Sequence, residues 1–325
     1  MYITHIHKKF ITYICSKYYI VNNSSILLSI SGGQDSLSLL KLTLDLKKHY
    51  HWKVCLTYFD HKLREDSYFN LKQLLNILRI TRLKSCIYEN FSRTDAELQY
   101  REWRYKILFH IAHTNHYSKI FTAHTLTDLS ETFIHHIIRG CSIDSLANIS
   151  STTKHNTLMD ISILRPLLCI KRIETGWLCK KFYLPLWSDY TNYECKRTRN
   201  RLREELIPYL QQYFQPKIYC KIDTFLQNTQ LDMEYLRKAT IKLYYLVKHP
   251  YFVAINYSIL LSHPEALQYR VIRLFFKHNF NTVLTKSTIC KITVYLAKKK
   301  QMISFINSLK FQLFFTNSWL YALIL

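Results

Sequence analysis

Glycine is scarce in this sequence, which has 4 glycines among 325 residues where ordinary usage would give about 23. Tyrosine and phenylalanine are abundant, with 25 and 18 residues, a mixture typical of an A+T-rich coding genome. A glycine that persists under such a bias is expected where no other residue fits the backbone. The adjacent pair Gly32 and Gly33 is therefore the first place to look for a functional turn.

Paired cysteines and long apolar runs are also missing. No CxxC pair occurs among the 9 cysteines, so the sequence encodes no zinc ribbon and no obvious dithiol or iron–sulfur site. Their odd number and wide scatter indicate a reducing compartment. The uncharged segment 311–325 is shorter than the roughly 20 residues that cross a membrane, and we expect it to form a hairpin. We expect a soluble protein without a membrane partner, because Lys17 also interrupts the N-terminal apolar run too early for a signal peptide.

Acidic residues are few, with 22 Asp and Glu against 45 Lys and Arg, which leaves a formal net charge of +23. Two explanations have equal weight at this point. Biased codons can produce a Lys-rich surface, and a polyanionic partner such as RNA can require a basic one. If RNA binds, the affinity should fall steeply as the salt concentration rises.

Apolar runs alternate with helical patterns through the first part of the chain. The runs occupy residues 25–30, 54–59, 83–88 and 119–123, and the helical patterns residues 37–49, 68–80, 96–114 and 129–138. This alternation is typical of an α/β fold with a doubly wound parallel sheet. Further along, the pattern becomes mostly helical, over residues 222–247, 264–278 and 286–299. We therefore expect two domains, a larger α/β domain over residues 1–215 and a smaller, mostly α-helical domain over residues 216–325.

The segment Ser31-Gly32-Gly33-Gln34-Asp35-Ser36 lies between the first expected strand and its helix. Its glycines permit a tight turn whose N–H groups and helix N-terminus face an anion. Ser31 and Ser36 can donate to phosphate oxygens, and Asp35 can hold a magnesium ion that bridges them. An ordinary helix-start turn is the structural alternative, because Ser and Asp are common caps. The density of fixed residues favours a phosphate-binding turn, although no lysine follows as in the GxxxxGK[ST] loop.

These six residues match the SGGxDS loop of the PP-loop ATP pyrophosphatases, which split ATP into AMP and pyrophosphate. Further motifs narrow the resemblance: Asp60–Arg64, Glu97–Tyr105, Thr122–His124 with Asp128 and Glu131–Phe133, Arg139-Gly140, Arg165–Leu168, Asp189–Asn192 and Arg199–Arg203. In this order and spacing the set closely resembles the tRNA(Ile)-lysidine synthases, over about residues 24–216. The chain departs from that family at Thr191, where Ser is usual, and at Leu129, where Gln is common.

The resemblance implies an ATP-dependent ligase. In this family the C2 oxygen of the wobble cytidine in a CAU-anticodon tRNA(Ile) attacks ATP, and lysine then displaces AMP to give lysidine, so that the anticodon reads AUA instead of AUG. The implied cofactors are ATP and Mg2+, and the implied partners are tRNA(Ile) and free L-lysine, with a homodimer left open. Residues 1–215 would form the ATP-binding catalytic domain and residues 216–325 a short tRNA-binding domain. The composition and the family suggest the plastid stroma, with the bacterial cytoplasm as the alternative.

Several residues near the turn are candidates for ATP binding and catalysis. His61 and Arg64 follow the second expected strand and could meet phosphate or the developing adenylate charge, although a solvated loop is the alternative. Arg104 shares one helix face with Glu97 and Arg101. A surface ion pair is as reasonable there, but we expect Arg104 to act in catalysis beside Asp35 and His124.

Three polar residues follow the fourth expected strand. Asp128 and Glu131 lie on one face of a helix start and could bind the ammonium group of lysine, although the helix dipole alone would favour carboxylates there. His124, with an ordinary pKa near 6.5, could take a proton from the attacking amine. A histidine packed in the core is the equal alternative.

Five cations lie among the eight residues 196–203. A solvated helix face is the usual reason for such a run, but beside an ATP site we favour contact with tRNA phosphates through Arg197, Arg199, Arg201 and Arg203. Lys298–Lys300 could extend that surface. Two other functions fit less well: a tRNA-thiolating enzyme typically uses paired cysteines, and a catalytically inactive RNA-binding protein would not need an intact Ser31–Ser36 turn.

Overall fold

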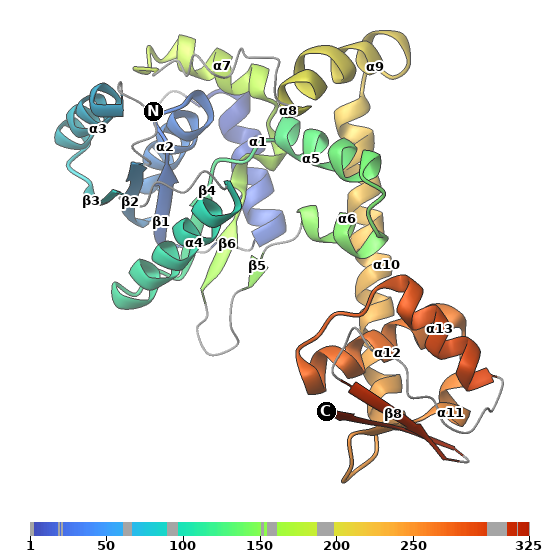
Figure 1. Ribbon diagram of the computed structural model, residues 1–325. Helices are drawn as coiled ribbons and strands as arrows, with labels where there is room; N and C mark the ends of the chain where they lie inside the picture. The colour runs from blue at the N-terminus through green and yellow to red at the C-terminus, as the bar shows by residue number, and fades with distance from the viewer. Residues whose placement is uncertain are drawn as a thin grey trace. The chain divides into compact units, whose positions relative to one another are not determined.

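The computed structural model describes residues 3–18, 20, 22–60, 67–89, 97–150, 153–154, 161–186, 198–297, 311–316 and 318–324. The chain divides into two compact units, Met1–Asn228 (unit 1) and Thr229–Leu325 (unit 2). The division falls within the long helix α10, Ile218–Val247 (Figure 1).

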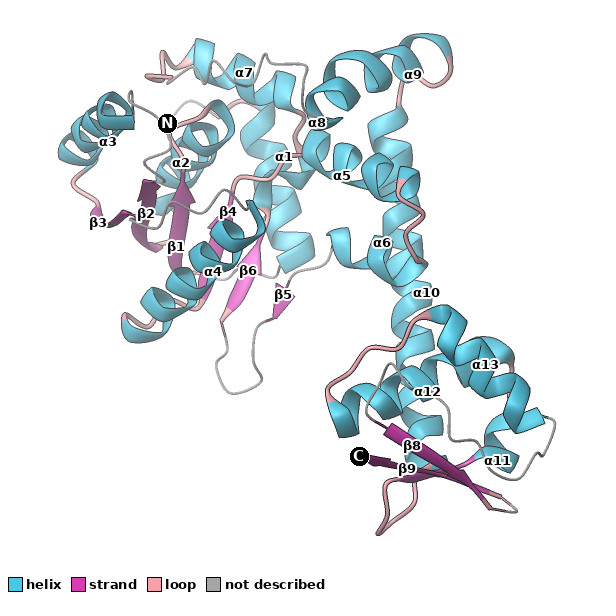
Figure 2. Cartoon of the chain, viewed as in Figure 1, coloured by secondary structure: helices cyan, strands magenta, loops and turns pink. Residues whose placement is uncertain are grey.

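Unit 1 contains a six-stranded sheet in the order β3-β2-β1-β4-β6-β5 (Figure 2). The strands β3, β2, β1, β4 and β6 are mutually parallel, and β5 at the edge is antiparallel to β6. Their bounds are β1 Ser25–Ile30, β2 Lys53–Asp60, β3 Lys84–Glu89, β4 Lys119–Thr122, β5 Thr153–Lys154 and β6 Ser162–Leu164. This arrangement confirms the expected doubly wound α/β fold. The sequence pattern had not revealed β6, because its three residues are buried and too short to show a periodicity.

Helices cover both faces of this sheet, and the side chains of β1 show how. Ile26, Leu28 and Ile30 belong to the core shared with α1 and α2, whereas Leu27 belongs to the core shared with α4. A strand buried on both faces reads as a continuous apolar run, which is what the sequence has there. The helices of unit 1 up to residue 181 are α1 His5–Tyr13 with its π-helical extension Ile14–Tyr18, α2 Gln34–Lys47, α3 Ser67–Thr81, α4 Glu97–Thr114, α5 Leu126–Ile138, α6 Ile143–Ser150 and α7 Arg172–Lys181.

A helical segment closes unit 1. It runs through α8 Thr198–Arg201, a π-helical turn Leu202–Leu206 and α9 Ile207–Tyr213 into α10. Ile207 is fully buried in a cluster with Leu129 of α5, Leu146 of α6 and Ile222 of α10. Leu168 of the 3-10 helix η2, Pro166–Cys169, joins the same cluster. This packing fixes α9 relative to α5 and α6.

Unit 2 is mostly helical, as expected, and ends in the expected hairpin. Its helices are the end of α10, α11 Tyr257–Leu261, α12 Glu265–Phe280 and α13 Lys286–Ala297. The strands β8 Phe311–Phe315 and β9 Trp319–Ile324 pair antiparallel, and β7 Ala254–Asn256 adds to the other edge of β9. Among the described helices, none combines the length and the apolar character that a membrane crossing requires.

Candidate functional site

The turn between β1 and α2 has the backbone that an anion site needs. Gly32 has a φ of +81°, in the left-handed region, and a Cβ there would also collide with the side-chain amide of Asn70. Gly33 is the N-cap of α2 and has no side chain to cap the first N–H groups of the helix. The Ser36 hydroxyl donates to the Gly33 carbonyl at 2.8 Å, and the Ser31 hydroxyl lies 3.4 Å from that of Ser36. Two hydroxyls and a helix N-terminus therefore converge on one turn.

Asp35 lies in the first turn of α2, and two side chains of α7 hold its carboxylate. Thr175 Oγ1 donates to Oδ1 at 2.5 Å, and Arg172 Nη1 lies 3.2 Å from Oδ2. Burial raises the pKa of Asp35, and the charge of Arg172 opposes that effect. Within the described ranges, no cluster of three or more His, Cys, Asp or Glu side chains is arranged to hold a metal ion. One carboxylate beside a phosphate-binding turn still suits Mg2+, which usually combines one or two carboxylates with phosphate oxygens and water.

Helix α7 packs directly on this turn, which the sequence had not revealed. The Gln34 amide donates to the Arg172 carbonyl at 2.7 Å and to Thr175 Oγ1 at 2.9 Å. Gly176 faces the same side chain, and a Cβ at this position would lie 3.3 Å from Gln34 Nε2. The close approach of α7 to the turn therefore explains why position 176 has a glycine. No pattern in the sequence connects α7 to residues almost 140 positions earlier.

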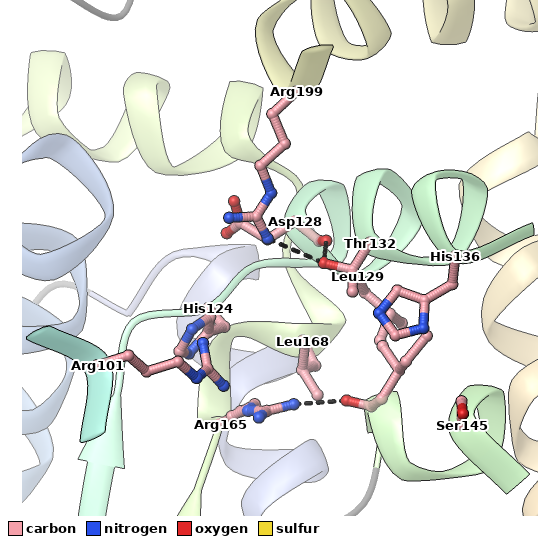
Figure 3. A pocket seen from close by; sticks show the side chains of 11 residues that line it. Arg101, His124, Asp128, Leu129, Thr132, His136, Ser145, Arg165, Leu168 and Arg199 are labelled. Atoms are coloured by element: carbon pink, nitrogen blue, oxygen red, sulfur yellow. Dashed lines mark hydrogen bonds between the residues drawn. The ribbon is translucent and has the colours of Figure 1, made fainter. Parts of the chain in front are cut away.

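A pocket of about 220 Å³ lies beside the β4–α5 connection (Figure 3). It is rich in cations, because Arg101 of α4, Arg165 before η2 and Arg199 of α8 all line it. Figure 3 shows Arg199 extending from α8 toward Thr132. The Arg165 guanidinium donates a hydrogen bond to the Ile149 carbonyl. The other lining residues are His124, Asp128, Leu129, His136, Ser145 and Leu168.

The pocket contains some of the expected residues and adds others. His124, Asp128 and Arg199 come together as lining residues, and Arg101 and Arg165 join them. Arg104 is not among the described residues that line the pocket. Its guanidinium lies over the Tyr105 ring, 5.6 Å from the ring centroid.

His124 is half-buried, and its Nδ1 lies 3.0 Å from the Thr122 hydroxyl. Burial lowers the pKa of His124 to about 3, and the positive charges of Arg165, Arg104 and Arg101 add to the effect. The imidazole is therefore neutral at physiological pH, well below the ordinary titration range assumed from sequence. It has a lone pair that can accept a proton, and the arginines around it oppose the charge that this proton would bring.

The two carboxylates expected to bind lysine both contact Arg203. Arg203 Nε donates to Glu131 Oε1 at 2.6 Å and Nη2 donates to Oε2 at 2.9 Å, while Nη2 lies 3.5 Å from Asp128 Oδ1. The Glu131 side chain is only 1% exposed, and burial raises its pKa against the opposing effect of Arg203. Asp128 also accepts hydrogen bonds from the N–H and hydroxyl of Thr125, which cap α5. Asp128 thus faces the pocket, whereas Glu131 anchors the π-helical turn Leu202–Leu206 to α5.

The remaining expected residues are less connected to the pocket. Arg201 is exposed and pairs with Glu205 at 3.1 Å. His61, Arg64, Arg197, Asp189–Asn192 and Lys298–Lys300 lie outside the described residues.

Comparisons with known proteins agree on the family. The PP-loop domain matches residues 3–210. A chloroplastic tRNA(Ile)-lysidine synthase of Pyropia yezoensis is 37% identical over 98% of this chain and 95% of its own length. The corresponding chloroplastic protein of Gracilaria tenuistipitata is 39% identical over 86% and 87% of the two chains. A tRNA(Ile)-lysidine synthase from Nostoc is 34% identical over 83% and 82%.

A solved structure supports the fold alone. The U34-tRNA thiolase NcsA from Methanococcus maripaludis, solved with its [4Fe-4S] cluster, superposes with a TM-score of 0.56 at 16% identity. The superposition covers 68% of this chain and 77% of that chain. The Ser31–Ser36 turn, its place at the end of β1 and the match to curated relatives along nearly the whole chain lead to one assignment. The chain belongs to the tRNA(Ile)-lysidine synthase family of PP-loop proteins.

Proposed function

We propose that the chain joins L-lysine to C2 of the wobble cytidine in CAU-anticodon tRNA(Ile), using ATP. The observation that carries this proposal is the phosphate-binding turn of Ser31–Ser36 together with a cation-rich pocket around His124 and Asp128. In an open α/β sheet, both belong at the carboxyl ends of strands, where such folds bind ligands. The match to a lysidine synthase along 95% of that protein supplies the substrate.

In the first step the cytidine O2 attacks the α-phosphorus of ATP. The O2–P bond forms, the bond from the α-phosphorus to the bridging oxygen breaks, and pyrophosphate leaves with that electron pair. The N–H groups of the Ser31–Ser36 turn bind the leaving pyrophosphate. Mg2+ held by Asp35 and phosphate oxygens would neutralise part of its charge. Arg101, Arg104 and Arg165 provide positive charge toward the α-phosphate, and His61 and Arg64 are proposed to contribute from the loop after β2.

In the second step the ε-amine of lysine attacks C2, the C2–O2 bond breaks, and AMP leaves with O2 and the electron pair of that bond. Asp128, which faces the pocket, binds the ammonium group of the incoming amino acid. Glu131 supports it indirectly, because Arg203 bridges the two carboxylates. The amine must lose a proton as the bond forms, and the neutral imidazole of His124 accepts it. The phosphate of the adenylate would offset the arginine charges that oppose this protonation.

The tRNA lies against the basic segment before α9 in this proposal. Arg199 and Arg201 contact backbone phosphates together with Arg197, and residues 216–325 add a further basic surface. Relatives named as chloroplastic proteins support the plastid stroma as the location.

The direct test is incubation of the chain with ATP, Mg2+, radiolabelled lysine and a CAU-anticodon tRNA(Ile) transcript. We expect label in the RNA and one AMP and one pyrophosphate per lysine, and no label with a UAU transcript. Asp35→Ala should lower pyrophosphate release by at least about 1000-fold, while its tRNA affinity stays within about threefold of the original chain. Unlabelled RNA, with RNA binding intact, would contradict the proposal.

A further inference from the structure

Helix α7 fixes the main chain of Arg172 against the phosphate-binding turn. The Arg172 carbonyl accepts a hydrogen bond from the Gln34 amide at 2.7 Å, and its N–H donates to Thr127 Oγ1 at 3.1 Å. One turn further along, the Thr175 carbonyl accepts from Ser38 Oγ at 3.1 Å. The main chain at Arg172 is therefore tied both to α2 and to α5, independently of its own side chain.

The Arg172 side chain points to Asp35 and remains within reach of a ligand. Its Nη1 atom lies 3.2 Å from Asp35 Oδ2, and the side chain is 31% exposed. Asp35 itself is 15% exposed, with its other oxygen taken by Thr175. The guanidinium therefore pairs with Asp35 and still has N–H donors that a ligand can reach.

A side-chain cation beside the turn suits its chemistry, because the Mg2+ that Asp35 would hold neutralises only part of the pyrophosphate charge. Residues 31–36 contain no Lys or Arg and one acid, Asp35, so a pyrophosphate group there meets a negative charge. N–H groups and hydroxyls solvate phosphate, but they do not neutralise it. A guanidinium in contact with the turn does so, and its planar donors match two phosphate oxygens at once.

We propose that Arg172 binds the β- and γ-phosphates of ATP in the Ser31–Ser36 turn and pairs with Asp35 when they are absent. This inference rests on the ATP-binding part of the proposed function. It assigns to α7 a direct share in the pyrophosphate site.

The test compares three ligands that share different parts of ATP. Binding of ATP, inorganic pyrophosphate and AMP to the full chain is measured by isothermal titration calorimetry with Mg2+ present. For Arg172→Gln we expect Kd for ATP and for pyrophosphate to rise by about 10- to 100-fold. Kd for AMP, which lacks the β- and γ-phosphates, should stay within about twofold. Arg172→Lys keeps the charge without the paired donors and should fall between the two chains.

Lys180→Gln is the matched control. It removes an exposed cation from the last turn of the same helix, so pyrophosphate affinity should stay within about threefold. Pyrophosphate affinity unchanged in Arg172→Gln would overturn the proposal. So would equal weakening of AMP and pyrophosphate, which indicates general damage to the site.

These measurements need neither lysine nor tRNA, so they separate the two proposals. If the original chain binds pyrophosphate through Arg172 but transfers no lysine, only the lysidine reaction fails. If the original chain binds neither ATP nor pyrophosphate, both proposals fail. Thermal unfolding of each variant, expected within about 2 °C of the original chain, confirms that the fold is kept.

Discussion

The two units of the chain carry their positive charge differently. Unit 1 has 32 Lys and Arg against 19 Asp and Glu, and at its candidate site the acids are matched with arginines: Asp35 with Arg172, and Glu131 with Arg203. Unit 2 has 13 Lys and Arg against 3 Asp and Glu in only 97 residues. Paired charges of this kind position groups for chemistry, whereas an unmatched excess attracts a polyanion without selecting its sequence. This difference agrees with the proposal that unit 1 carries out the reaction and unit 2 adds affinity for RNA.

The largest effect should follow a change of backbone in unit 1. Gly32→Ala introduces a Cβ at a φ of +81° and against Asn70, so either the turn or the Asn70 side chain that donates to the Ser31 carbonyl must shift. We expect about a 100-fold loss of lysine transfer, because displacement of a positioning group by about 1 Å costs that much. Affinity for tRNA should stay within about threefold, as measured by filter binding.

Gly140→Ala is the matched control for this change. Gly140 also has a positive φ, +69°, but a Cβ there meets nothing within 4 Å. It imposes similar backbone strain of about 1 kcal/mol away from the turn, so transfer should fall by less than about threefold. Equal losses in the two variants would show that strain, and not the phosphate site, is responsible.

The second effect concerns stability and should be confined to unit 1. Arg203→Met leaves the buried Glu131 carboxylate without its partner, which should cost about 3 kcal/mol. Hydrogen exchange followed by mass spectrometry should show faster exchange in α5 and in α8–α9, and unchanged exchange in α12 and α13. Arg201→Met breaks an exposed pair with Glu205 and should cost less than about 1 kcal/mol. Equal exchange in the two arginine variants would contradict the distinction.

The third effect is a pH dependence that His124 introduces. Its pKa is lowered to about 3 in the folded chain, whereas the unfolded chain should titrate near the ordinary value of about 6.5. Between these values the unfolded state binds more protons, so the free energy of unfolding falls as the pH falls from about 6.5 toward 3. Between pH 7 and pH 5 the loss should be roughly 1–2 kcal/mol. Urea unfolding of His124→Asn should lack this part of the pH dependence; an identical dependence in both chains would contradict it.

The smallest effect tests the charge of unit 2. Lys277 and Lys291 are both exposed, and replacing both by Gln should raise Kd for tRNA a few fold. The slope of log K against log salt should become shallower by about 1 for each lysine that contacts phosphate. Lys48→Gln, an exposed lysine of unit 1, is the control and should leave the slope unchanged. Equal slopes in all three chains would favour codon bias as the origin of the charge.

The local parts of the fold and site could be predicted from the sequence. The strand, turn and helix around Ser31–Ser36 are adjacent in the chain, so the apolar run, the glycines and the helical pattern all report on one place. The hairpin β8–β9 was predictable for the same reason. Whether a segment of unit 1 forms a strand or a helix likewise follows from the spacing of its own apolar residues.

The contacts between distant segments could not be predicted. Thr175 reaches Asp35 across 140 positions, and Arg203 reaches Glu131 across 72. No sequence pattern marks either pair, because the two residues of each pair meet only after separate helices have packed. The pKa of His124 is similar: the arginines that lower it come from α4 and from the segment before η2.

Gly176 shows what this dependence means for the phosphate-binding turn. Because α7 lacks a side chain there, it can approach Gln34 closely enough to accept the hydrogen bonds of its amide. The turn therefore depends on contacts with α7, which is translated long after β1 and α2. A synthetic peptide of residues 25–47 would contain the whole SGGxDS motif and still lack the surface that holds Gln34 and Asp35 in place. During synthesis, the nucleotide site can reach this arrangement only after residue 181 has emerged.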